Sequence, residues 1–188
     1  MAAYLTDILQ SNAAGLLAAV LINSDLQAAE AAPATAHIYA QRADRCQIAP
    51  LEEEAGHPDR ADAVIRNGEH FVDCQRFRGD ILDHRGDWPG AQQAYAAAVA
   101  LAPDLPAGYY SWGVALARHG DLAGAQSKLK DANQRGPHWA DPLKAWGDVP
   151  LKQDKTKEAL AKYDEALKFA PNWRQLKEAR AATANHET

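Results

Sequence analysis

The residue types best suited to chemistry in this chain are two cysteines and the histidines near them. His70 and Cys74 are four residues apart, so on a helix they share one face. With Cys46 or His84 they could supply the nitrogen and sulfur ligands of a metal ion. No second pair at a fixed spacing accompanies them, so a half-buried histidine and a small apolar cysteine are the favoured interpretation. Two cysteines are also too few for a disulfide framework in a chain of 188 residues.

Carboxylates offer the only other catalytic candidates. Asp80 and Asp83 could act as a pair, but acids three residues apart on an exposed helix are common. The run Glu52, Glu53 and Glu54 is interpreted as a solvated helix start or loop. The sequence has no phosphate-binding glycine loop, nucleophile elbow or His-Glu-x-x-His motif. We therefore expect a protein that is not an enzyme and that needs no cofactor and no metal.

The composition points to helices. The chain contains 41 alanines and only 3 phenylalanines, and alanine is the best helix former. Runs of the β-branched and aromatic residues that favour strands are scarce. An apolar fraction of 47% argues against disorder. The calculated pI of about 5.8 argues against a nucleic-acid-binding module, so nucleic acid is not an expected partner.

No apolar run has the roughly 18–20 residues that a membrane-spanning helix needs. The longest candidate, Ala13 to Ile22, is interrupted by Gly15. The first basic residue is Arg42, so the N-terminal segment lacks the positive region of a signal peptide. We predict no membrane span and a cytoplasmic location, with the periplasm as the less favoured alternative.

An internal repeat of 34 residues provides the elements that position these side chains. Five columns recur through three copies without a gap. They are Gly79, Gly113 and Gly147; Ala91, Ala125 and Ala159; Tyr95, Leu129 and Tyr163; Ala98, Ala132 and Ala166; and Pro103, Pro137 and Pro171. A repeat of this length indicates stacked supersecondary units.

Each copy is expected to form two antiparallel helices. Gly86 and Gly120 stand where a glycine in a left-handed conformation ends the first helix. Asp87 and Asp121 follow as N-caps of the second helix. The small residues of the repeat, such as Gly79, let the two helices approach closely.

Pro150 lies inside the first helix of the third copy. A proline there removes one backbone hydrogen bond and costs about 3 kcal/mol in a helix interior. We expect a kink or an early helix end, with a role for the released carbonyls near Trp146 as the alternative. Asp154 replaces the stop glycine, and aspartate tolerates the left-handed conformation better than most residues.

The pattern resembles the tetratricopeptide repeat (TPR). The second copy matches best, with Tyr109, Trp112-Gly113, Leu116, Ala125, Leu129 and Pro137 at the family's positions. The resemblance implies an all-α fold, a right-handed α-solenoid of antiparallel helix pairs. The predicted divisions are 72–105, 106–139 and 140–173 for the repeats and 174–188 for a capping helix and tail. Residues 1–71 form an N-terminal helical region, with a degenerate repeat as one alternative.

Within the N-terminal region we predict helices over about residues 3–22 and 25–43. A loop through Ala49-Pro50 and Gly56-His57-Pro58 is expected next. A further helix should begin near Asp59 and end near Asn67-Gly68.

The resemblance also implies a concave groove lined by the first helices. Projecting the helical period onto that face selects a mixed set of acids, bases and aromatic residues. They are Asp73, Arg76, Phe77, Asp80, Asp83, His84, Tyr110, Ser111, Val114, Ala117, Arg118, Asp141, Lys144, Ala145, Asp148, Leu151 and Lys152. Such a surface suits an extended peptide or a helix.

Some TPR proteins hold a C-terminal carboxylate with lysine and asparagine in this groove. The matching positions here are Arg76, Asp80, Ser111, Asp141 and Ala145, and the two acids would repel a carboxylate. An acidic chaperone tail is therefore disfavoured as a partner.

Two pairs of tryptophans occupy equivalent positions in successive repeats. Trp112 and Trp146 are interpreted as core, and Trp139 and Trp173 as packing over the turns between repeats.

The favoured function is a non-catalytic protein-interaction module or scaffold that binds a protein or peptide partner. A self-associating assembly component, that is a homo-oligomer, is the first alternative. A small enzyme or a metal-binding protein is the alternative of another class.

Overall fold

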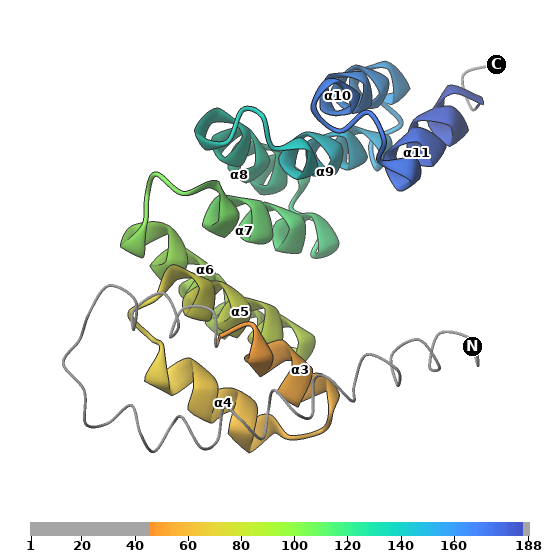
Figure 1. Cartoon of the computed structure of the whole chain (residues 1–188). Coiled ribbons are helices and arrows are strands. Elements are labelled where there is room, and N and C mark those ends of the chain that lie inside the picture. The colour runs from red at the N-terminus through yellow and green to blue at the C-terminus, as the bar shows by residue number, and fades with distance from the viewer. Residues whose placement is uncertain (1–45, 186–188) are drawn as a thin grey trace. The chain divides into compact units, whose positions relative to one another are not determined.

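The computed structural model describes residues 46–185, which contain nine helices and no strand (Figure 1). The helices are α3 (Ile48–Glu54), α4 (Pro58–Asn67), α5 (Val72–His84), α6 (Trp88–Leu101), α7 (Pro106–Arg118), α8 (Leu122–Arg135), α9 (Ala140–Leu151), α10 (Thr156–Phe169) and α11 (Arg174–Asn185). The chain divides into two units, residues 1–39 and 40–188, and all nine helices belong to the second. The predicted helices over 3–22 and 25–43 lie outside the described residues.

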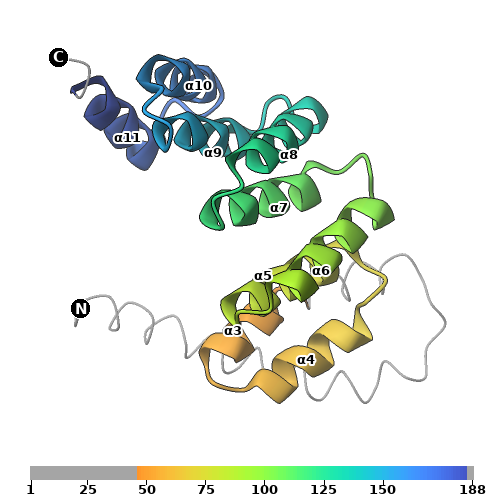
Figure 2. The ribbon, with the colours of Figure 1, turned by 180° about the vertical axis from the view of Figure 1, so that it is seen from behind.

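Three helix pairs follow one another along the chain, α5 with α6, α7 with α8 and α9 with α10. Each second helix also packs against the first helix of the next pair, α6 on α7 and α8 on α9. Figures 1 and 2 show this alternation from opposite sides. The predicted all-α solenoid of antiparallel helix pairs is confirmed for this part of the chain.

The turns within the helix pairs have the predicted left-handed residues and aspartate N-caps. Gly86 and Gly120 take φ values of +82° and +81°, and Asp154 adopts the same left-handed region at +58°. A hydrogen bond of 3.0 Å from the amide of Gly90 caps α6 through the carboxylate of Asp87, and Asp121 caps α8 in the same way. These residues therefore reverse the chain at the end of each first helix.

Glycine allows the paired helices to approach closely. A Cβ atom on Gly113 would lie 2.7 Å from Cγ of Leu129, and one on Gly79 would lie 2.5 Å from the ring of Tyr95. Both distances are shorter than any ordinary carbon contact. The facing alanines Ala91 and Ala125 are completely buried. The repeat columns thus mark the contact between the two helices of a pair.

Pro150 lies in the last turn of α9, and the helix ends one residue short of the position equivalent to the end of α7, which agrees with the predicted early end. Helix α9 stops at Leu151, one residue later, and the proline side chain is buried. Its carbonyl accepts a 3.0 Å hydrogen bond from the amide of Lys155, as the carbonyl of Leu116 does from Asp121. The turn of the third repeat therefore forms despite the proline.

The N-terminal part of the described chain differs from the prediction. Helix α3 occupies residues that the sequence suggested were a loop, so that expectation is wrong at Ala49-Pro50. Ala49 is completely buried, and burial of such an apolar face stabilises a short helix that propensity alone does not. Helix α4, which begins at Pro58, agrees with the predicted helix near Asp59.

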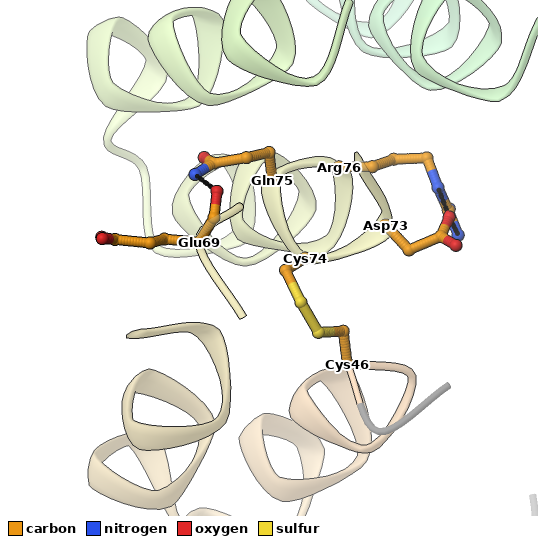
Figure 3. The surroundings of a disulfide bond; sticks show 6 residues. All are labelled: Cys46, Glu69, Asp73, Cys74, Gln75 and Arg76. Atoms are coloured by element: carbon orange, nitrogen blue, oxygen red, sulfur yellow. Dashed lines mark hydrogen bonds and ion pairs between the residues drawn. A yellow bond between two sulfur atoms is a disulfide. The ribbon is translucent and has the colours of Figure 1, made fainter. Parts of the chain in front are cut away.

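A disulfide between Cys46 and Cys74 joins the turn just before α3 to α5 (Figure 3). The two Cα atoms are 5.0 Å apart, within the usual range for this bond. Both cysteines are buried. The side-chain amide of Gln75, next to Cys74, donates a 2.7 Å hydrogen bond from Nε2 to the backbone carbonyl of Glu69. The interpretation of Cys74 as a small apolar cysteine did not foresee this bond, which forms because α3 packs on α5 and brings Cys46 to Cys74.

Candidate functional site

A hollow of about 710 Å³ lies between α3, α5 and α7, and we call it the α5–α7 hollow. Eight of the seventeen groove candidates line it: they are Arg76, Asp80, Asp83, His84, Tyr110, Ser111, Val114 and Arg118. Asp73 and Phe77 on α5 and Asp141, Lys144, Asp148 and Lys152 on α9 are not in its wall. The structure thus brings the candidates of two repeats together in one depression. Their contact with a partner stays a prediction.

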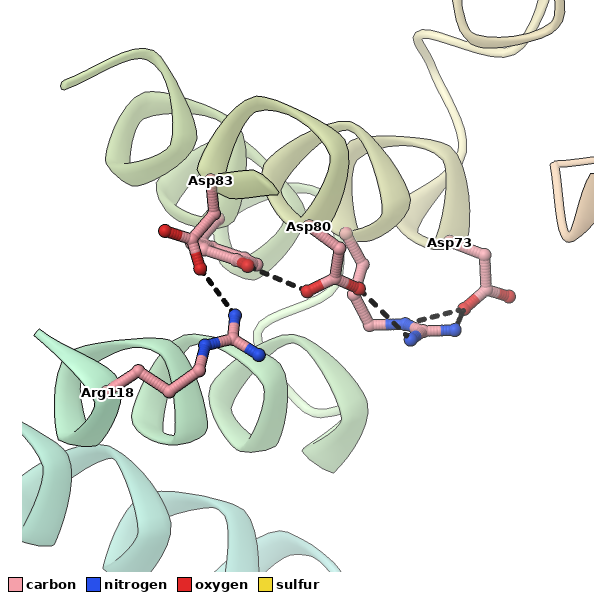
Figure 4. A network of polar contacts seen from close by, with 6 residues as sticks. Asp73, Asp80, Asp83 and Arg118 are labelled. Atoms are coloured by element: carbon pink, nitrogen blue, oxygen red, sulfur yellow. Dashed lines mark hydrogen bonds and ion pairs between the residues drawn. The ribbon is translucent and has the colours of Figure 1, made fainter. Parts of the chain in front are cut away.

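Asp80 is held in the wall of the hollow by a tyrosine from the second helix. The hydroxyl of Tyr95 donates a 2.7 Å hydrogen bond to Oδ1 of Asp80, and Arg76 Nη1 lies 4.0 Å from Oδ2 (Figure 4). Burial raises the pKa of Asp80 despite these contacts. Burial also raises the pKa of Tyr95, and the charge of Asp80 adds to the effect. A carboxylate is therefore held in the wall of the hollow by a fixed hydrogen bond.

Asp83, one turn further on, links two repeats. Its carboxylate accepts hydrogen bonds from Arg118 and His119, both at the end of α7. Its side chain is only 8% exposed. Burial opposes ionisation, but the two hydrogen bonds outweigh it and lower the pKa of Asp83. The ring of His119 also stacks on Trp88 at a centroid distance of 3.9 Å. This cluster fixes the spacing of α5 and α7, and therefore the width of the hollow.

The ends of the predicted groove are built from intramolecular ion pairs. On α5, Arg76 lies 3.4 Å from Asp73 and over the ring of Phe77 at 4.0 Å. On α9, Lys144 donates to Asp148 at 2.7 Å. Lys152 reaches back to α7 and donates to the carbonyl of Ala117 at 2.7 Å, so it ties the second repeat to the third.

Tyr110 lies on α7 in the wall of the hollow. Its half-buried ring contacts Trp139 at a centroid distance of 4.8 Å. Burial raises the pKa of Tyr110, and the nearby carboxylates of Asp141 and Asp148 raise it further. Ser111 beside it is buried. The predicted packing of Trp139 near a turn agrees with this contact and with its position next to Gly136.

Sequence reasoning missed several residues of the wall. Pro50, Glu53 and Glu54 come from α3, and Ile81 and His119 complete the lining. Glu53 is not a solvated residue of an acidic run, because Arg85 donates to it at 2.6 Å and lowers its pKa. No local sequence pattern predicts this ion pair, because 32 residues separate Glu53 from Arg85.

The two repeat-equivalent tryptophans, Trp112 and Trp146, are half buried and pack against the hydrophobic core, which agrees with their predicted role. The ammonium group of Lys128 lies 4.2 Å from the ring centroid of Trp112. Lys162 lies 4.0 Å from that of Trp146, in the same repeat position. Each tryptophan is covered by a lysine of the second helix, a favourable cation–π arrangement. Trp146 and Lys162 also line a second hollow of about 500 Å³.

The arrangement offers no support for the metal hypothesis. Cys46 and Cys74 are bonded to each other, and the side chain of His70 is 88% exposed rather than half buried. Within residues 46–185 no group of three or more metal-ligating side chains occurs. Asp80 and Asp83 are each engaged with different donors, Tyr95 and Arg118.

None of the helices in the described part of the chain is both long and apolar enough to cross a membrane.

Solved structures with the same arrangement of helix pairs are TPR proteins. The Pseudomonas aeruginosa protein pilF is 17% identical, with a TM-score of 0.69 over 79% of this chain and 70% of that one. YrrB, described as a TPR protein with an unusual peptide-binding site, is 20% identical, with a TM-score of 0.60 over 72% and 71% of the two chains. The TPR2B domain of yeast Sti1, solved in complex with pHsp70, is 19% identical, with a TM-score of 0.55 over 61% and 97%.

At these identities the likeness establishes the fold, which is that of the tetratricopeptide repeat. No protein-family model matches the sequence, and no curated protein matches it.

Proposed function

We propose that the chain is a non-catalytic interaction module that binds a segment of a partner protein along α5, α7 and α9. The observation that carries this proposal is the α5–α7 hollow, in which charged, aromatic and apolar side chains of neighbouring repeats meet. YrrB and the Sti1 domain, which share the fold, are described with a peptide-binding site and with a bound pHsp70. Peptide binding in a groove between helices is therefore the use of this surface that we favour.

The hollow is preorganised for a ligand. Asp83 is fixed by Arg118 across the two repeats, and Asp80 is fixed by Tyr95. A surface whose side chains are already ordered loses less conformational entropy on binding than a mobile one. The ligand then contacts a wall that does not need to rearrange.

Panning a phage-displayed dodecapeptide library on the full chain tests this proposal. The best peptide is then titrated by calorimetry against the wild type, Tyr110→Ala and the control Lys168→Ala. Lys168 is exposed on α10 and lies outside the hollow. Loss of an aromatic anchor weakens binding by about tenfold or more, whereas the control is expected to bind as the wild type does. Equal affinity of all three proteins, at unchanged melting temperature, would place the site elsewhere.

Self-association is the second candidate, and a specific observation favours it. Leu101, Leu105 and Phe169 are large apolar side chains at helix ends, with exposed fractions of 46%, 52% and 41%. Exposed apolar groups of this kind occur at protein–protein contacts. Light scattering over a range of concentrations tests this candidate, because a constant monomer mass excludes it.

The disulfide also bears on the compartment. The predicted cytoplasmic location conflicts with the Cys46–Cys74 bond, since disulfides persist mainly in oxidising compartments. We therefore favour the alternative of a periplasmic or other oxidising environment. Alkylation of the native protein followed by mass spectrometry decides this, and two alkylated thiols would restore the cytoplasmic assignment.

A further inference from the structure

The intramolecular pairing of the charged groove residues indicates which kind of partner segment the groove binds. This inference rests on the proposed function. Every arginine and lysine predicted for the groove already has a partner within the protein. Arg76 pairs with Asp73 and Asp80, and Arg118 pairs with Asp83. On α9, Lys144 pairs with Asp148, and Lys152 donates to a backbone carbonyl. A ligand carboxylate or phosphate would have to displace one of these contacts before it could bind.

The acids of the groove have acceptor capacity left. Asp80 accepts one hydrogen bond through Oδ1 from Tyr95, while Oδ2 has only Arg76 at 4.0 Å. An ionised carboxylate has about four acceptor sites on its two oxygens. Among residues 46–185, no hydrogen bond or ion pair connects Glu54 or Asp141 to a donor. The arginine and lysine side chains of the groove are therefore engaged, while several carboxylate acceptors are available to a ligand.

Tyr110 provides an aromatic surface between these acids. It lines the hollow beside Asp80, and its other neighbour is Trp139. The carboxylates of Asp141, Asp148 and Asp80 all act on its hydroxyl, and Arg76 is the cation that opposes them. An aromatic ring surrounded by carboxylates attracts a cation through both the ring quadrupole and the negative charges.

We propose that the α5–α7 hollow and the adjoining start of α9 bind a cationic segment of a partner protein. A lysine or arginine side chain of that segment lies against Tyr110 and donates to Asp80, Asp141 or Glu54. Charge complementarity argues for this occupant, because four acids line the hollow, Glu53, Glu54, Asp80 and Asp83, against two arginines that are already paired. The acids that disfavour an acidic tail at the family's carboxylate-binding positions are the same ones that favour a basic segment.

The dodecapeptides selected on the full chain provide the first test. We expect the selected peptides to be enriched in lysine and arginine over aspartate and glutamate, relative to the unselected library. Selected peptides that are acidic, and that lose affinity with Tyr110→Ala, would overturn this inference and leave the proposed function intact. Peptides insensitive to Tyr110→Ala would overturn the proposed function as well.

Neutral variants of the acids provide the second test. A synthetic peptide of the best selected sequence is titrated against Asp141→Asn, Glu54→Gln and the control Asp59→Asn. Asp59 is an exposed acid on α4 outside the hollow. We expect each groove variant to raise Kd about three- to tenfold, with a larger effect at low salt, and the control to change it less than twofold.

A matched peptide with its lysines and arginines replaced by glutamine controls the ligand side, and it should lose both affinity and salt dependence. Unchanged Kd values for both groove variants, at unchanged melting temperature, would overturn the assignment of these carboxylates. If light scattering shows a dimer that Tyr110→Ala dissociates and that the peptide does not displace, the proposal of a separate partner fails.

Discussion

The hydroxyl of Tyr95 donates a 2.7 Å hydrogen bond to Asp80, and the same contact recurs two repeats later. There, Tyr163 donates to Asp148 at 2.6 Å. In the middle repeat the two positions hold Leu129 and Val114, so both polar partners are replaced together. A buried donor or acceptor without a partner is costly, whereas an apolar pair of suitable shape is not. The structure therefore has two interchangeable ways to join the helices of a repeat, and the polar one fixes a carboxylate in the groove.

Removing the tyrosine hydroxyl is expected to destabilise the fold. Tyr95→Phe leaves Asp80 without its buried donor, which costs about 1–3 kcal/mol. Chemical denaturation followed by circular dichroism measures the change. The double variant Tyr95→Phe with Asp80→Val removes both polar groups and should recover part of the loss. A double variant less stable than the single one would contradict the proposed exchange of polar for apolar pairs.

The pH dependence of stability should differ in sign between Asp83 and Asp80. The pKa of Asp83 is lowered in the folded state, from an ordinary value of 3.8. Its stabilising contribution is therefore complete above pH 3.8 and is lost as the pH falls through the lower folded-state pKa. Melting temperatures measured from neutral pH down to acid should show a smaller acid-induced loss for Asp83→Asn than for the wild type.

Asp80 supplies the matched control for that experiment. Its pKa is raised by burial, so the ionised side chain is disfavoured in the folded state and the cost appears as the pH rises through the folded-state pKa. Asp80→Asn should therefore gain stability relative to the wild type as the pH rises from acid. The same pH profile for both variants would show that the contacts of Asp83 with Arg118 and His119 are not present in solution.

A methyl group at Gly113 should be destabilising. The added Cβ would lie 2.7 Å from Cγ of Leu129, and overpacking of this kind costs about 1–3 kcal/mol. Gly108→Ala on the same helix is the control, since its Cβ would lie 3.4 Å from the nearest atom of Val99. That substitution should be neutral or stabilise by up to about 1 kcal/mol, because alanine favours the helix. Thermal melts of the two variants check both expectations.

Pro150→Leu is expected to stabilise the third repeat modestly. The proline stands one residue before the end of α9. A proline so close to the helix end destabilises the helix less than one in its middle, so its replacement recovers less free energy. We expect a gain of about 1 kcal/mol, below the roughly 3 kcal/mol of a mid-helix proline. Leucine occupies the corresponding position in the second repeat as Leu116. A loss of stability would mean that the buried proline ring fits its site better than leucine does.

Breaking the disulfide should loosen α3 and α4 from the repeats. Cys46 and Cys74 are separated by 28 residues, and a bond closing such a loop stabilises a protein by about 2–4 kcal/mol. Adding a reducing agent should lower the melting temperature of the wild type. The double variant Cys46→Ser with Cys74→Ser should already melt at that lower temperature and should not respond to reduction. A response of the double variant would show that the reagent acts elsewhere.

The sequence by itself determined the repeat, the turns and the close helix contacts. Gly113 and Leu129 are 16 residues apart and belong to one helix pair, so their contact recurs wherever the pattern recurs. The left-handed turn residues act through their own backbone conformation, which needs no distant partner. Asp154 could therefore be predicted in place of a glycine.

Only the tertiary structure decided which charges are available in the groove. Asp83 and Arg118 lie 35 residues apart, and Glu53 and Arg85 lie 32 apart. Many acids and bases are compatible with the same helical pattern, so their pairing depends on how the helices stack and on which side-chain conformations then meet. The helix α3 and the Cys46–Cys74 disulfide depend on the same packing, because a seven-residue helix is stable only against a partner surface.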